Sequence, residues 1–150
     1  MKNLGHNLAW LAAVAWIGGL WAIGYLAVPV LFQTLPDKML AGLLAGKMFS
    51  WMAYLGMACA LYLLAYRYRN PGGAARQVPL WMLGLLLLLT LIGEFGFQPA
   101  MAALKVQALP GDVMHSAYAS RFKMLHGIAS ISYLVQSLLG AALLLKMARR

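Results

Sequence analysis

The chemistry that this sequence suggests centres on one carboxylate inside an apolar segment. Glu94 is the only glutamate among 150 residues, and it lies near the end of a run of apolar residues. Placing an ionisable side chain inside a membrane is costly, so such a residue indicates a functional site by default. A structural ion pair or a wet interface at the end of the run would also explain it, and the sequence is compatible with both interpretations.

Further polar residues are predicted to lie at a depth similar to that of Glu94. The third apolar run ends at this level and the second and fourth runs begin there, with polar residues near each of these ends. Ser130 lies one helical turn from His126, since residues four apart share a helix face. Glu94 and His126 are the members that can respond to protonation. The predicted ligand-binding cluster, called the predicted cluster below, comprises Lys47, Glu94, Gln98, Arg121, Lys123, His126 and Ser130.

Other arrangements of reactive side chains are weakly supported. His6 and His126 are expected on opposite sides of the membrane, and His115 and His126 would stand about 16 Å apart on a continuous helix. Ten methionines and the single cysteine, Cys59, suit a soft metal such as Cu(I), although methionine is also a common apolar filler. A metal is therefore left unassigned. The chain has no P-loop, HExxH, CxxC or dinucleotide fingerprint, so the sequence does not identify an enzyme.

Composition indicates that lipid is the solvent for much of the chain. Hydrophobic residues make up 63% of the sequence and charged residues 10%, against roughly 25% charged residues in soluble domains. About 20 helical residues cross a bilayer. We therefore expect an all-α membrane protein, a single domain over residues 1–150 that forms a four-transmembrane-helix bundle. The predicted spans are residues 8–32, 46–66, 79–97 and 125–145.

The connections between these runs predict an orientation. Residues 70–73 (Asn-Pro-Gly-Gly) form a turn signal, and residues 99–122 form the longest connection, with helix-forming residues before a break at Leu109–Pro110. Cytoplasmic loops are enriched in Lys and Arg, which favours N-in/C-in, with both termini in the cytoplasm. That side holds seven basic residues, Lys2, Arg67, Arg69, Arg76, Lys146, Arg149 and Arg150, against five on the other, Lys38, Lys47, Lys105, Arg121 and Lys123.

The basic residues and the small residues have structural explanations. A formal net charge of +9 suits anionic lipid headgroups here, and no basic motif typical of nucleic-acid binding is present. Gly42 and Gly46 are four apart and would let helices approach closely, within the bundle or at a homo-oligomer face.

Three stretches of the sequence resemble one family. They are residues 16–32, ending in Pro29-Val30-Leu31-Phe32; residues 35–49, including Leu35-Pro36, Ala41-Gly42 and Gly46 to Phe49; and residues 122–130, which contain Leu125-His126-Gly127. This pattern resembles the bacterial domain of unknown function 4149, related to transmembrane protein 205-like proteins. The resemblance implies a four-span bundle in the bacterial inner membrane, and it implies no reaction. The eukaryotic relatives are associated with resistance to a platinum drug, which implies a link to soft-metal export.

Three functional hypotheses follow. The first is a protein that binds, or helps to move, a small polar, lipid or soft-metal ligand through the predicted cluster. The second is an accessory or structural subunit of a larger membrane complex. The third is a haem- or quinone-linked membrane redox enzyme, which would purify coloured.

Overall fold

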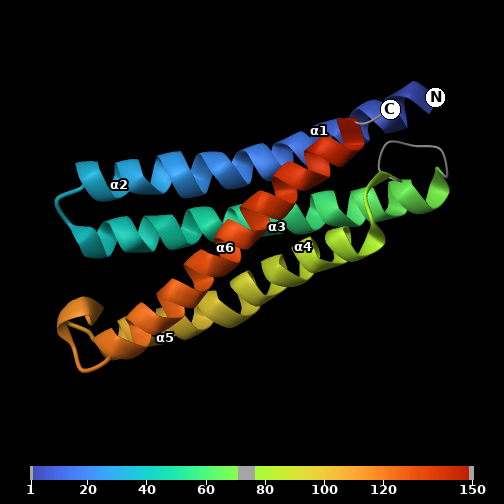
Figure 1. The fold of residues 1–150 in the computed structure, drawn as a ribbon. Helices are drawn as coiled ribbons and strands as arrows, with labels where there is room; N and C mark the ends of the chain where they lie inside the picture. The colour runs from blue at the N-terminus through green and yellow to red at the C-terminus, as the bar shows by residue number, and fades with distance from the viewer. Residues whose placement is uncertain (1, 71–76, 149–150) are drawn as a thin grey trace.

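Four long helices make up the protein. The computed structural model describes residues 2–70 and 77–148, and these contain no strand. The first long helix comprises α1 (Lys2–Trp21), the π-helical turn η1 (Ala22–Ala27) and α2 (Val28–Thr34), and the second is α3 (Lys38–Arg69). The third comprises α4 (Leu80–Ile92), the π-helical turn η3 (Gly93–Phe97) and α5 (Gln98–Gln107). The short 3₁₀ turn η4 (Val113–His115) precedes α6 (Ala119–Ala148), the fourth (Figure 1).

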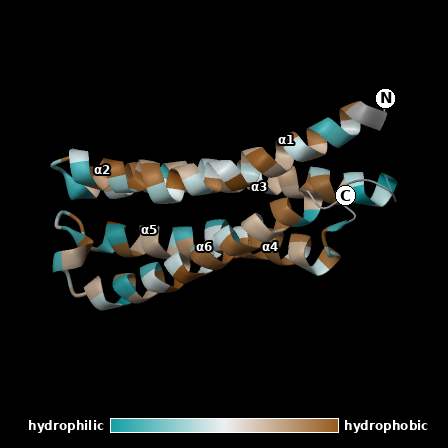
Figure 2. Cartoon of the chain, turned by 45° about the horizontal axis from the view of Figure 1, so that its top comes forward, coloured by the Kyte–Doolittle hydropathy of each residue, from teal (hydrophilic) through white to brown (hydrophobic). Residues whose placement is uncertain are grey.

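Each long helix is long and apolar enough to cross a membrane. The four candidate spans are Leu4–Thr34, Lys38–Arg69, Leu80–Gln107 and Ala119–Ala148. Figure 2 shows hydrophobic residues along most of their length and hydrophilic residues gathered toward the turns. The predicted fold class, an all-α membrane bundle of four helices, is confirmed.

Both described chain ends lie at one end of the bundle. Lys2 and Ala148 stand near the end of α3 and the start of α4, whereas the α2–α3 turn and the α5–α6 connection stand at the opposite end (Figure 1). We call the latter the α2/α5 end. Asn70 caps α3, but the rest of the predicted turn, residues 71–73, lies outside the described residues, as do Arg76, Arg149 and Arg150. Which end faces the cytoplasm remains a prediction.

The third helix extends well beyond the predicted run of residues 79–97. Pro99 lacks an N–H and would clash with the carbonyl four residues earlier in a regular helix. The π-helical turn η3 accommodates it, and the helix continues to Gln107. The connection expected at residues 99–122 therefore shortens to residues 108–118. Glu94 consequently lies near the midpoint of the third helix and not near its end.

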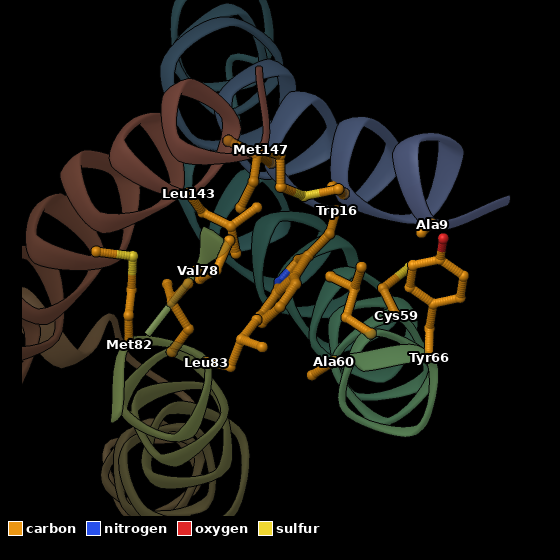
Figure 3. Packing of buried hydrophobic residues seen from close by; sticks show 14 of the residues in the cluster. Ala9, Trp16, Cys59, Ala60, Tyr66, Val78, Met82, Leu83, Leu143 and Met147 are labelled. Carbon is orange, nitrogen blue, oxygen red and sulfur yellow. The ribbon is translucent and has the colours of Figure 1, made fainter. Parts of the chain in front are cut away.

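The hydrophobic core occupies the half of the bundle nearest the chain ends. There α1, α3, α4 and α6 meet around Trp16, which is 1% exposed and lies between Leu83 and Ala60 (Figure 3). Gly56 of α3 leaves room for the indole ring of Trp16. In lipid, close packing of this kind is what holds helices together.

The other half of the bundle separates into two helix pairs. Toward the α2/α5 end, α2 packs on α3 and α5 packs on α6. In the described part of the chain, no comparable contact joins α2 to α5 or α6. The polar side chains of the third helix lie in this less tightly packed half.

Candidate functional site

Four polar side chains follow one another along the third helix. Glu94, Gln98 and Lys105 turn toward α3, where their partners lie, whereas Thr90 bonds to Gln136 of α6. We call these four residues the polar stripe. It begins near the middle of the helix and runs toward the α2/α5 end.

Two members of the polar stripe reach across to backbone carbonyls of α3. The Gln98 amide Nε2 donates to the Gly46 carbonyl at 3.3 Å, and the Lys105 Nζ donates to the Gly42 carbonyl at 3.2 Å. A Cβ at Gly42 would lie 3.6 Å from that Nζ, in ordinary van der Waals contact, so the amine lies directly against the glycine. Lys105 also lies over the Phe122 ring of α6, 5.6 Å from its centroid. The glycine pair thus packs against polar side chains within the bundle.

Thr90 joins the third helix to the fourth. Its hydroxyl donates to the Leu86 carbonyl at 2.8 Å and accepts from the Gln136 Nε2 at 3.3 Å. Thr90 and Gln136 are 6% and 7% exposed, so this bond satisfies two polar groups that water does not reach.

Glu94 is the member of the polar stripe whose bonding is incomplete. Its Oε2 atom is buried and has no hydrogen-bond partner among the described residues. The Tyr54 hydroxyl of α3 lies beside this carboxyl group and interacts with it. In the described part of the chain, no Lys, Arg or His forms an ion pair with Glu94. A buried carboxylate oxygen without a donor is costly in a protein interior and more so in a membrane.

The other two carboxylates have structural roles. Asp37 caps α3 by accepting from the Met39 and Leu40 N–H groups at 2.8 and 3.1 Å. Asp112 caps η4 by accepting from the Met114 N–H at 3.0 Å, and it pairs with His115 at 3.7 Å. Among the acidic residues, only Glu94 lacks such a role.

A second polar network links η1 to α6 at the start of the less tightly packed half. The Tyr25 hydroxyl donates to Ser137 Oγ at 2.8 Å, and Ser137 Oγ donates to the Tyr133 carbonyl at 2.9 Å. The Tyr133 hydroxyl donates to the Leu20 carbonyl, and its ring lies against Gly24. This network fixes the position of η1 against the fourth helix.

The structure separates the predicted cluster into two groups. Glu94 and Gln98 belong to the polar stripe, whereas the other five members are exposed. His126 stacks on Phe122 with ring centroids 6.0 Å apart, and the Ser130 hydroxyl donates to the His126 carbonyl at 2.8 Å. Their side chains are exposed, and none of the five forms a hydrogen bond or ion pair with Glu94 in the described part of the chain. The exposed members are Lys47, Arg121, Lys123, His126 and Ser130.

Residues suited to a metal do not gather in the described part of the chain. No group of three His, Cys, Asp or Glu side chains is close enough there to hold an ion. Cys59 is buried in the hydrophobic core, and Met52 packs beside Gly19. These two sulfur side chains are therefore part of the packing between α1 and α3.

The polar partners that the sequence analysis missed are Lys105, Thr90 and Gln136. Lys105 was assigned to a connection and not to a helix. Thr90 had a usable signal, since it stands four residues before Glu94 and eight before Gln98. Gln136 had none, because its contact with Thr90 depends on how α6 is rotated against α4.

Comparison with known proteins gives one family. The model of the family described as domain of unknown function (DUF4149) matches residues 11–110, which include all of the polar stripe. No curated protein and no solved structure matches the chain.

Proposed function

The chain belongs to the family of the domain of unknown function DUF4149, and we propose that it binds a small ligand inside the membrane at Glu94. The observation that supports this is the buried Oε2 atom without a partner, near the midpoint of a membrane-spanning helix. Thr90, Gln98 and Lys105 in the same stripe all have partners. The ligand that suits the remaining oxygen is positively charged or donates a hydrogen bond.

The route to Glu94 runs from the α2/α5 end. Close backbone packing there is confined to the pairs α2–α3 and α5–α6, and Gln98 and Lys105, whose side chains bridge to α3, stand between Glu94 and that end. The exposed members of the predicted cluster lie on α3 and α6 toward the same end, outside the polar stripe. Binding at Glu94, with passage along the polar stripe, is the function that this arrangement supports best.

The setting of this function is part of the proposal. We place the protein in the bacterial inner membrane, with both chain ends in the cytoplasm and the α2/α5 end on the outer side. The excess of basic residues beside the chain ends supports this orientation. Fusing a reporter that is active only in the cytoplasm to the C-terminus tests it, since an inactive fusion would reverse the orientation.

Native mass spectrometry of gently solubilised protein tests the binding proposal. We expect an adduct on the wild type that Glu94→Gln loses, and that the control Asp37→Asn keeps because Asp37 only caps α3. The His126→Ala variant should keep the adduct at wild-type occupancy, since His126 is exposed and stacks on Phe122 away from Glu94. A wild type without any adduct, accompanied by a co-purifying protein, would contradict the proposal and favour an accessory subunit.

A further inference from the structure

Two π-helical turns occur at matching places in the first and third helices. The Val28 N–H donates to the Ile23 carbonyl, and the Gln98 N–H donates to the Gly93 carbonyl, each five residues back along the chain. Each donor is followed directly by a proline, Pro29 or Pro99. Single π turns of this kind are frequent at functional sites.

These turns free backbone carbonyl oxygens in the middle of the membrane. In a regular helix each carbonyl accepts a hydrogen bond from the N–H four residues later, so the Glu94 carbonyl would pair with Gln98 and the Phe95 carbonyl with residue 99. Here the Gln98 N–H donates to the Gly93 carbonyl instead, and Pro99 has no N–H to donate. Neither the Glu94 nor the Phe95 carbonyl therefore receives its usual donor. The same reasoning frees the Gly24 and Tyr25 carbonyls in the first helix.

Free carbonyls at this depth need another partner. Without water, an unsatisfied backbone group in a bilayer costs several kcal/mol, and irregular backbone is tolerated where protein or a polar cavity satisfies it. In membrane transport proteins, carbonyl oxygens that lack a helical donor where a helix is interrupted bind cations. The η3 turn brings such a carbonyl to the residue that also carries the unpartnered carboxylate.

The donors around Glu94 are oxygen atoms. They are its carboxylate, its own main-chain carbonyl and the Tyr54 hydroxyl beside it. Lys105 is about 16 Å farther along the helix axis, at 1.5 Å per residue, and its amine is bound to Gly42. Oxygen donors favour hard cations over soft ones.

The charge of the site limits the cation to one positive charge. One carboxylate neutralises a monovalent ion, whereas a divalent ion would leave a net charge in a medium of low dielectric constant. We infer that Glu94 and the η3 turn bind an alkali cation, with sodium as the physiologically abundant example. This inference rests on the proposed function, and it names the class of ligand.

Carbodiimide labelling in the presence and absence of sodium tests the inference. Dicyclohexylcarbodiimide modifies protonated carboxyl groups in apolar surroundings, and peptide mass spectrometry locates the product. In choline chloride we expect labelling of full-length wild-type protein at Glu94. Choline is then replaced with sodium at constant ionic strength, at a sodium concentration ten times its dissociation constant for the site. Labelling should slow about tenfold, because only the sodium-free protein reacts and most of the sites are then occupied.

A matched pair of variants identifies the role of Tyr54. Tyr54→Phe should raise the sodium concentration needed for protection, since it removes an oxygen donor. Tyr68→Phe makes the same change in the same helix at an exposed position and should leave that concentration unchanged. Absence of Glu94 labelling, or labelling that sodium and choline affect equally, overturns the inference. A Glu94-dependent adduct in native mass spectrometry would then show that the proposed function stands without sodium.

Discussion

Adding a single methyl group to Gly140 tests how closely the fourth helix approaches the first. A Cβ at Gly140 of α6 would lie 2.6 Å from Cδ1, 2.9 Å from Cγ2 and 3.1 Å from Cγ1 of Ile17 in α1. Cβ atoms in proteins essentially never approach other atoms to less than 3.0 Å, so something must move. Ile17 is fully buried, which leaves its side chain little room to do so.

The expected loss follows from comparison with a second glycine in the same helix. Gly127→Ala introduces a Cβ that meets nothing within 4 Å, so it should keep or raise stability by up to about 1 kcal/mol through helix propensity. Gly140→Ala has the same propensity gain, but overpacking costs about 1–3 kcal/mol. We therefore expect Gly140→Ala to be less stable than Gly127→Ala by about 1–3 kcal/mol.

Reversible unfolding in mixed micelles, followed by far-ultraviolet circular dichroism, measures this difference. Adding Ile17→Ala should relieve the overlap, so that the double variant loses less than the sum of the two single changes. Equal stability of the two glycine variants would refute the packing of α1 against α6 described above.

Three further predictions concern contacts elsewhere in the bundle. Thr90→Val should lower the free energy of unfolding by about 1–3 kcal/mol, measured by thermal unfolding, because it leaves the buried Gln136 amide without its acceptor. Adding Gln136→Leu should recover most of that loss, and strictly additive effects would argue against the bond. Asp37→Ala should lower the free energy of unfolding by about 1 kcal/mol and speed amide hydrogen exchange in the first turn of α3. Unchanged exchange in that turn would exclude the cap. Gly42→Val should displace the Lys105 amine from its carbonyl and raise the rate of Lys105 acetylation several-fold, measured by peptide mass spectrometry; an unchanged rate would contradict the contact.

The existence of four helices could be predicted because it depends on apolar length alone. A run long enough to cross a bilayer must be helical to satisfy its backbone, whatever it packs against. The end of the third helix could not be predicted in the same way, because Pro99 is normally a sign that a helix stops. The π turn that lets the helix continue, and the Gly42 carbonyl that accepts from Lys105, both depend on the folded arrangement.

The candidate site was predictable only in part for a related reason. Glu94 and Gln98 stood out as polar residues in or beside an apolar run, and the expected topology already placed them at a similar depth. The exposed position of His126 depends on how α6 is rotated, and that rotation is fixed by packing such as Ile17 against Gly140. A single sequence records the depth of a residue in a helix better than the direction in which its side chain points.

The stability of Glu94→Gln in sodium-free choline buffer tests the central claim most directly. If the carboxyl group is kept for a ligand, then the ligand-free wild type has a buried oxygen without a partner, and replacing this ionisable group by a neutral amide should help folding. We predict that Glu94→Gln is more stable than the wild type by about 1–3 kcal/mol in this buffer, and that a bound ligand reduces the difference. A variant that is less stable than the ligand-free wild type would show that Glu94 supports the fold, and would contradict the account.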